Sequence, residues 1–498
     1  MTLPLTLPVA VMVLVPVLVP LAAACGYAVL GWNKVTAWLG ALAAAALLAA
    51  AVVSAITVSG TRQAVTAWDL LRVDPLSAFM LIVIGAVALL ATLASPAYLA
   101  GDHTHARAAR RYGMLTQAFI AAMALAVLAS NLGVMWVAIE ATTILTAFLV
   151  GFHPSRQATE AAWKYVVICS AGIVLAFLGI VLVHYAALHA GLTAAEALDG
   201  AALARHAVGL DPGVMRIAAV LLVLGFGAKA GLAPMHAWLP DAHSQAPAPV
   251  SALMSGVLLS VAFYAILRIK LITDVALGPA TMRVLLIAAA LGSLAVAAAL
   301  LLAQRDYKRL LAYSSIEHMG LLALGAAIGT RLALAAVLLH MLGHGLGKSA
   351  LFLSAGHIHQ AVASSRIDAA RGLIRRSPLL AGAFALGLLA LLGMPPFSLF
   401  ASELGIVRAG FAAGLGWAIA AALLLMLIIV AAVGRHGRRM LLGSPPPATQ
   451  PVTQAIALPR TAALTLIVAL AACAILGITT GPLGDLLHGA AAIVGATP

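Results

Sequence analysis

Long apolar runs recur along the whole sequence, and short polar segments separate them. Each run is about as long as the roughly 20 residues that a helix needs to cross a bilayer. No segment of domain size lacks such a run, so the pattern predicts one all-α integral membrane domain over residues 1–498. About fourteen transmembrane helices are predicted, at 5–30, 36–58, 74–95, 112–130, 131–151, 161–189, 214–242, 248–272, 281–303, 309–329, 331–358, 376–409, 414–433 and 460–487.

The composition excludes a soluble protein and most cofactor-binding classes. Hydrophobic residues make up 64% of the chain and charged residues only 9%, which is too few charges to cover a water-exposed surface. Cys25, Cys169 and Cys473 are scattered singly, without a C-x-x-C pair, so thiolate-held metals and iron–sulfur clusters have no ligands. We therefore expect no cofactor and no metal. The first thirty residues lack a basic start and are interpreted as a membrane helix, not a signal peptide.

Basic residues divide unequally between the two ends of the predicted helices. Of the 28 Lys and Arg residues, 17 fall on one side and 9 on the other, which leaves Lys229 and Lys348 within helices. The richer side is expected to be cytoplasmic, with both termini on the outer face of the cell (inner) membrane. The net charge of +13 is thus a topology signal and does not indicate nucleic acid.

Two of the predicted helices carry the same interruption. Residues 231–235 (GLAPM) and 393–397 (GMPPF) share the pattern G-x-x-P followed by a bulky apolar residue. Proline removes a backbone donor and obstructs the preceding turn, so both helices are expected to be discontinuous. Broken helices in two halves of a transporter point to its transport path.

Ionisable residues inside these helices are the first functional candidates, because burying one in a bilayer costs roughly 2.5–3.5 kcal/mol. Glu140 lies near the middle of the fifth helix, and Lys229 lies just before the break in the seventh. Together they are expected to form a buried ion pair, whose separation would let Lys229 release a proton. The alternative is a static structural pair.

The eleventh helix carries His340, His344 and Lys348 at a spacing of four residues. This spacing places the three side chains on one face of the helix, where they would form a proton relay. Metal binding is disfavoured here because the neighbouring lysine would repel the ion. Glu403, seven residues after the second break, is expected to be the terminal proton site; alternatively it lies at the outer interface beside Arg408.

Further titratable residues occur near the predicted cytoplasmic ends of helices. They are expected to bring protons to the buried groups, although Lys164 could equally set topology, and Asp241 and His243 could merely satisfy loop backbone. These candidates are Lys164, His236, Asp241, His243, Lys308, Glu317 and His318.

Three segments resemble motifs of one membrane protein family. Residues 228–247 (AKAGLAPMHAWLPDAHSQAP), 306–315 (DYKRLLAYSS) and 340–352 (HMLGHGLGKSALF) resemble the antiporter-like proton-translocating subunits of respiratory complex I, Mrp antiporters and membrane-bound hydrogenases. Within that family, residues 246–256 (APAPVSALMSG) and 316–320 (IEHMG) resemble component F of hydrogenase-4.

The resemblance implies two inverted five-helix repeats with helices seven and twelve discontinuous. It divides the chain into three N-terminal helices (1–111), a first repeat (112–272), a second repeat (281–433) and a last helix (460–487). It also implies the roles given above to Glu140, Lys229, the eleventh-helix residues and Glu403. Ser260 departs from the family pattern, because complex I subunits typically carry lysine there, so water or His344 must bridge the gap.

The expected function is proton translocation within a complex I-like or group 4 hydrogenase-like oxidoreductase. Redox chemistry would belong to a peripheral metal-containing arm reached through other membrane subunits. Alternatives are a subunit of a Mrp-type sodium/proton antiporter, a proton-supplying partner of an inorganic-carbon uptake complex, and a purely structural scaffold, against which the aligned buried charges argue.

Overall fold

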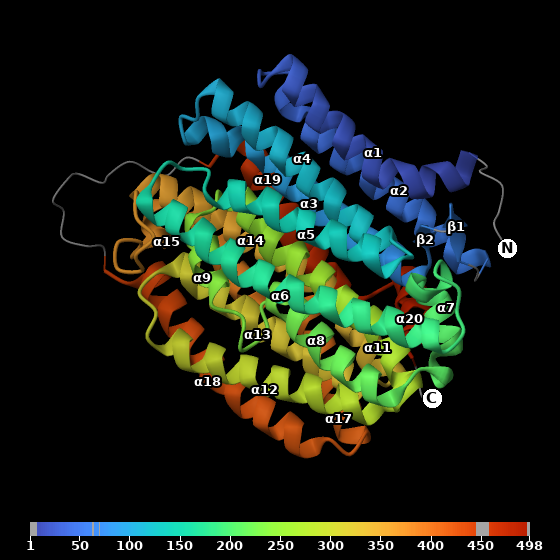
Figure 1. The fold of residues 1–498 in the computed structure, drawn as a ribbon. Helices are drawn as coiled ribbons and strands as arrows, with labels where there is room; N and C mark the ends of the chain where they lie inside the picture. The colour runs from blue at the N-terminus through green and yellow to red at the C-terminus, as the bar shows by residue number, and fades with distance from the viewer. Residues whose placement is uncertain (1–6, 62–63, 69, 445–457, 496–498) are drawn as a thin grey trace.

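The computed structural model describes residues 7–61, 64–68, 70–444 and 458–495. The long helices lie side by side in one bundle, with α1 (Leu7–Leu30) and α2 (Leu39–Thr61) along one edge and α18 (Gly416–Leu442) along the opposite edge (Figure 1). The fold is all-α, as predicted, apart from one short β-hairpin.

The elements follow one another along the chain as separate apolar segments. The first half contains α1 (Leu7–Leu30), η1 (Thr36–Trp38), α2 (Leu39–Thr61), β1 (Val65–Ala67), β2 (Leu71–Val73), α3 (Pro75–Gly101), α4 (Ala106–Leu128), α5 (Leu132–Val150), α6 (Arg156–His189), η2 (Glu196–Leu198), α7 (Gly200–His206), η3 (Ala207–Gly209), α8 (Pro212–Ala230) and α9 (Trp238–Gln245). The second half contains α10 (Ala248–Leu253), the π-helical turn η4 (Met254–Leu258), α11 (Leu259–Leu277), α12 (Pro279–Leu302), α13 (Tyr307–Ile328), α14 (Arg331–Val362), α15 (Leu373–Arg376), α16 (Pro378–Leu391), α17 (Ser398–Ala412), α18 (Gly416–Leu442), α19 (Arg460–Ile478) and α20 (Leu483–Ile493).

Thirteen helices among the described residues are long and apolar enough to cross a membrane. The predicted span 376–409 is absent from that number because it is divided into α16 and α17, so the predicted fourteen spans are accounted for. The single helix predicted at 460–487 is wrong in extent. It ends at Ile478, and after Gly481, which has a positive φ, and Pro482, the chain starts the separate helix α20.

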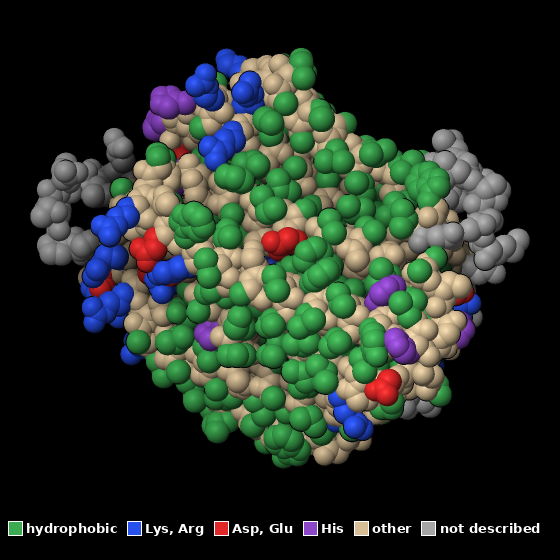
Figure 2. All heavy atoms as spheres, in the orientation of Figure 1, with side chains coloured by type: hydrophobic (Ala, Val, Ile, Leu, Met, Phe, Trp, Pro, Cys, Tyr) green, Lys and Arg blue, Asp and Glu red, His purple; other side chains and the backbone are tan. Residues whose placement is uncertain are grey.

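The surface agrees with a membrane location. In Figure 2, hydrophobic side chains cover the middle of the visible face, whereas Lys and Arg side chains gather mainly at one end of the bundle, with a smaller group at the other. Apolar surface between two charged ends is what a lipid environment requires. The chain is a multi-pass membrane protein.

Both predicted helix breaks are present. Helix α8 ends at Ala230 and α9 starts at Trp238, and Gly231 between them has φ +75°. Helix α16 ends at Leu391 and α17 starts at Ser398, and Gly393 between them has φ +60°. Positive φ is a conformation that glycine adopts without the steric cost that other residues meet, so each glycine redirects the chain while the proline prevents helical continuation.

Close packing between α6 and α8 fixes the position of the first break. A Cβ on Gly225 would lie 2.5 Å from the backbone nitrogen of Ala176, and the carbonyl oxygen of Gly225 lies 3.2 Å from where a Cβ on Gly172 would stand. The two backbones can approach so closely only because these residues have no side chain, which is a common way for membrane helices to pack.

Gly225→Ala is therefore expected to destabilise the protein by about 1–3 kcal/mol, because the added methyl group overpacks this crossing. Thermal unfolding in detergent checks this. Gly434→Ala in α18 is the matched control, since no atom lies within 4 Å of its added Cβ. Equal unfolding temperatures for the two variants would contradict the account.

Candidate functional site

The three central spans carry most of the buried titratable groups. The most apolar windows of α13, of α14 and of residues 248–277 are wholly buried inside the bundle. Side chains on these helices face neighbouring helices instead of lipid, so ionisable groups there lie within protein at membrane depth.

Lys229 stands in the last turn of α8, directly before the break, and is fully buried. Its Nζ donates a hydrogen bond to Oγ1 of Thr143 (2.7 Å) and another to the hydroxyl of Tyr165 (2.5 Å). The Tyr165 ring also lies below the ammonium group, with its centroid 4.8 Å from Nζ. Two helices, α5 and α6, therefore hold this lysine in place.

Glu140 reaches Lys229 through a hydroxyl group. Thr143 Oγ1 donates to Oε2 of Glu140 (2.9 Å), and Ser170 Oγ donates to Oε1 (3.1 Å). The sequence predicted a direct ion pair between Glu140 and Lys229; in the structure Thr143 stands between the two charged groups. Because a hydroxyl both donates and accepts, it links ammonium and carboxylate in one hydrogen-bonded chain. We call Glu140, Thr143, Tyr165 and Lys229 the first group.

Thr143→Val is expected to interrupt this chain while it preserves side-chain shape. Hydrogen bonds to charged groups contribute about 1.5–3 kcal/mol, so proton transfer through the first group should slow about tenfold to hundredfold. Proton translocation measured in membrane vesicles checks this. Thr57→Val, which removes an exposed hydroxyl of α2 bonded to Val53, serves as control; an equal effect of both substitutions would show that Thr143 is no link.

Three histidines from two helices form a second group. His318 Nδ1 lies 3.0 Å from Nε2 of His340, and Nδ1 of His340 lies 3.0 Å from the hydroxyl of Ser402. The ring centroids of His318 and His344 are 5.0 Å apart. All three histidines are fully buried. The predicted face of the eleventh helix is thus present on α14, and α13 adds His318 to it.

The Lys348 ammonium group is bonded to α13. Its Nζ donates to the backbone oxygen of Leu311 (2.7 Å) and to Oγ of Ser314 (2.5 Å), both on α13. Lys348 therefore lies on the predicted face of α14, and its ammonium group contacts the first half of α13.

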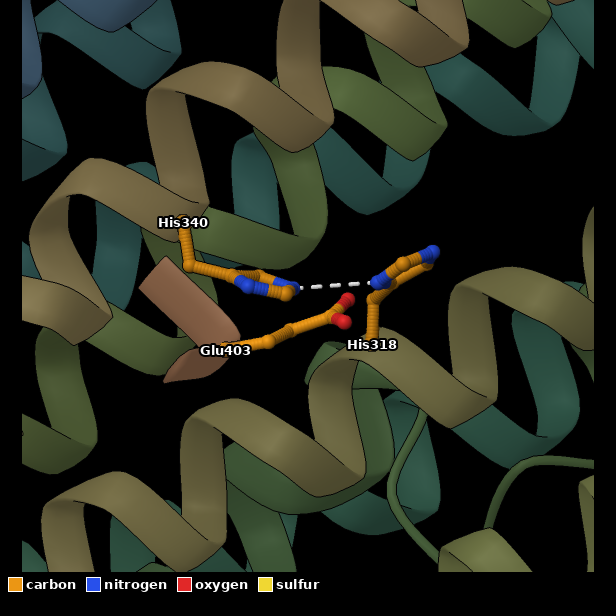
Figure 3. A group of neighbouring side chains, drawn as sticks. All are labelled: His318, His340 and Glu403. Carbon is orange, nitrogen blue, oxygen red and sulfur yellow. Dashed lines mark hydrogen bonds between the residues drawn. The ribbon is translucent and has the colours of Figure 1, made fainter. Parts of the chain in front are cut away.

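Glu403 on α17 joins the second group. One carboxylate oxygen of Glu403 and one ring nitrogen each of His318 and His340 all lie within 4.8 Å of one another. Figure 3 shows the carboxylate pointing between the two imidazoles. It also lies against the backbone of the break, where a Cβ on Gly393 would collide with it. Glu403 thus turns inward, whereas Arg408, its alternative partner, is exposed.

Several buried polar side-chain atoms have no hydrogen-bond partner. Within the described part of the chain, Oγ of Ser260 and both ring nitrogens of His344 and of His243 are buried without a hydrogen-bond partner. The His243 ring stacks on Phe352, with centroids 5.0 Å apart. Buried polar atoms are usually satisfied by protein or by ordered water, so these positions are natural sites for water.

Asp241 is the centre of a charged cluster at the predicted cytoplasmic end. Its carboxylate lies 3.2 Å from Nζ of Lys164 and 2.8 Å from a guanidinium nitrogen of Arg309, and Lys164 also pairs with Glu160 at 2.7 Å. These side chains line an open cavity of about 200 Å³. Asp241 and Lys164 thus contact each other at one opening, whereas half-buried His236 belongs to the break after α8.

Two of the three residues predicted near one helix end lie farther inside. Helix α13 begins at Tyr307, so Glu317 and His318 lie three turns inside it, and both are buried. They therefore lie deeper in the helix than a position near its cytoplasmic end implies. Lys308 is at the helix start, as predicted, but only 5% exposed.

The uncharged side chains that bond to the titratable site residues were not predicted from the sequence. Thr143, Tyr165 and Ser402 complete the two groups, and only Thr143 carried a signal, because it lies one helical turn after Glu140. The other two are brought in from distant helices.

Residues 129–429 match the family described as "NADH:quinone oxidoreductase/Mrp antiporter, TM". That segment includes both groups and both breaks. The chain belongs to this family. The homolog of hydrogenase-4 component F from Methylacidiphilum infernorum is 38% identical over 68% of this chain and 72% of its own length. Subunit N of the NADH-quinone oxidoreductase of Desulforudis audaxviator is 35% identical over 68% and 67%.

Two further relatives extend the comparison. Subunit N of the F(420)H(2) dehydrogenase of Methanosarcina mazei is 29% identical over 92% of both chains. Component B of hydrogenase-4 from Escherichia coli is 33% identical, but this chain spans only about half of its length (50%).

Solved structures establish the fold of this family member. A chain of an archaeal membrane-bound sulfane sulfur reductase matches with a TM-score of 0.87 at 23% identity, over 98% of both chains. A chain of the Mrp complex from Dietzia sp. matches with a TM-score of 0.86 at 23% identity, over 98% of this chain and 97% of its own. A chain of respiratory complex I from Thermus thermophilus matches at 0.79 and 22% identity, over 98% of this chain and 100% of its own.

Proposed function

We propose that this chain translocates protons as a membrane subunit of a complex I-like or group 4 hydrogenase-like oxidoreductase. Its relatives include components F and B of hydrogenase-4 and subunit N of NADH-quinone oxidoreductase. The observation that carries the proposal is the presence of one titratable group beside each helix break. Lys229 and the three histidines are fully buried, whereas Glu140 and Glu403 are partly exposed.

In the first group, a proton would move between Glu140 and Lys229 along the Thr143 hydroxyl. When Glu140 is ionised, the hydrogen-bonded chain favours the charged form of Lys229; when that charge is lost, burial favours neutral Lys229, which then releases a proton. The contacts at 2.7 and 2.9 Å are short enough for this transfer.

In the second group, the released proton would pass along the histidines to Glu403. An imidazole accepts a proton at one nitrogen and releases one from the other, and the 3.0 Å contact between His318 and His340 permits the exchange. Water at Ser260 and His344 would connect the groups. Lys348 and Glu317 would adjust the charge beside this path.

Partner subunits would supply the driving reaction. This chain has no cysteine pair for a redox centre, so electron transfer would occur in a peripheral arm, reached through neighbouring membrane subunits. The Lys164–Asp241 end would face the cytoplasm and take up protons, with both termini outside an inner cell membrane. Residues 112–272 and 281–433 would be inverted repeats, each containing one break.

The test is purification of the native complex through an affinity tag on this chain, followed by proton translocation in membrane vesicles. We expect redox-enzyme partners and acidification that depends on turnover in sodium-free buffer. Proton movement that requires sodium, together with antiporter partners, would support the Mrp-type alternative, and a zinc-containing uptake protein as sole partner would support inorganic-carbon uptake.

A further inference from the structure

His318, His340 and Glu403 come from three separate helices and converge in one buried place. Each offers one ligand atom, and the three atoms all lie within 4.8 Å of one another. Figure 3 shows that the atoms face a common point, with Glu403 between the two rings. Both histidines are fully buried, and Glu403 is half-buried.

The spacing fits a transition metal. Zinc binds imidazole nitrogen at about 2.0–2.1 Å and carboxylate oxygen at about 2.0–2.2 Å, which places tetrahedral ligand atoms roughly 3.4 Å apart. The two ring nitrogens are already 3.0 Å apart. A small movement of the Glu403 side chain would complete three ligands and leave the fourth position open to water.

The hydrogen bond at the second ring nitrogen of His340 favours this residue as a metal ligand. Its Nδ1 lies 3.0 Å from the hydroxyl of Ser402. If Nδ1 donates this hydrogen bond, Nε2 carries the lone pair that faces His318 and Glu403. A second ring nitrogen held in this way is typical of metal-bound histidines, because it fixes the tautomer and the ring orientation.

The sequence argument against a metal here was repulsion by Lys348, which acts electrostatically on His318 and His344 but makes its hydrogen bonds elsewhere. Lys348 lies two helical turns from His340, and its Nζ is held by Leu311 and Ser314. His344 and Glu317 are the other titratable groups beside the cluster. Glu317, on α13, lies within electrostatic range of both Glu403 and Lys348.

We propose that His318 Nδ1, His340 Nε2 and the Glu403 carboxylate form a binding site for one divalent transition-metal ion of the Zn²⁺ or Co²⁺ class. Two imidazoles and one carboxylate suit these ions, whereas Mg²⁺ and Ca²⁺ prefer oxygen ligands alone. The two neutral imidazoles and the carboxylate leave one net negative charge for the cation. Metal binding can be tested whether or not the proposed proton function holds. A bound ion would occupy the two ring nitrogens of the His318–His340 contact, so it should block proton transfer through the second group.

The test measures Zn²⁺ bound to the purified full chain, with a tag that contains no histidine, and absorption of Co²⁺ in the visible range. Wild type should bind one ion per chain, in the presence of excess Mg²⁺. His340→Gln and Glu403→Gln should each weaken binding more than about 100-fold, and Ser402→Ala should weaken it about 10–100-fold. His357→Gln, on the same helix outside the cluster, should bind like wild type.

Circular dichroism and gel filtration identify variants that do not fold. X-ray absorption by zinc on the wild-type chain provides a second test that needs no variant, and should show two imidazole ligands and one carboxylate. The proposal is overturned if the wild-type chain binds no ion, if His340→Gln and Glu403→Gln bind as tightly as His357→Gln, or if zinc has no imidazole ligand.

Discussion

Lys229→Ala is expected to abolish proton translocation while the complex still assembles. The substitution removes the only ammonium group of the first group and leaves Glu140 and Tyr165 without a proton carrier between them. A buried lysine whose charge depends on a neighbouring acid cannot be replaced by a side chain that does not titrate. Acidification of vesicles during turnover should fall to the background level.

Lys34→Ala is the control for this experiment, because Lys34 is an exposed lysine between α1 and α2. It should pump like wild type. Co-purification of partner subunits with both variants separates loss of transport from loss of assembly. Unchanged pumping by a fully assembled Lys229→Ala complex would remove this lysine from the path.

Asp74→Asn is expected to lower the stability of the protein more than any other single substitution of a residue at the helix ends. Asp74 is 1% exposed, caps α3 through the N–H groups of Leu76 and Ser77, and pairs with Arg72 (2.9 Å) and Arg268 (2.7 Å). Asparagine keeps the cap but leaves two arginines unpaired. Removing one partner of a buried ion pair typically costs about 3–5 kcal/mol.

Thermal unfolding in detergent measures this loss, and Asp368→Asn is the matched control. Asp368 also contacts two arginines, Arg371 and Arg439, but it is 45% exposed, so its loss should cost less than about 1 kcal/mol. Similar unfolding temperatures for the two variants would show that the Asp74 cluster does not hold this end of the bundle together.

The same cluster predicts how stability depends on pH. Burial alone would raise the pKa of Asp74, but the guanidinium groups of Arg268 and Arg72 hold that pKa well below its usual range. A carboxyl group whose folded pKa is lowered stabilises the protein fully above its unfolded pKa, about 3.9. That contribution is lost as the pH falls below this value, and Asp74→Asn should lack this part of the acid dependence.

Hydrophobic run length and helix breakers were sufficient to predict most of the fold. Apolar runs gave the spans because a bilayer sets their length, and G-x-x-P marked the breaks after α8 and α16 because the chemistry of glycine and proline is local. Helix α20 was merged with α19 in the prediction, although Gly481 and Pro482 between them form a local turn signal.

The neighbours of each buried charge could not be predicted, because they depend on how distant helices pack. Tyr165 lies 64 residues from Lys229, and Ser402 lies 62 residues from His340. Helical spacing placed His340 and His344 on one face, but no local pattern placed His318 or Glu403 opposite them. The inference that only two lysines are internal was also incomplete, since Lys270 is 3% exposed and pairs with Asp274.

The central claim is that one continuous polar path joins the first and second groups. A cryo-EM map of the purified complex, at a resolution that shows ordered water, tests it most directly. We predict water density hydrogen-bonded to Oγ of Ser260 and to the ring nitrogens of His344, continuing toward Lys229. Dry, closely packed apolar side chains between Lys229 and His344 would contradict the claim.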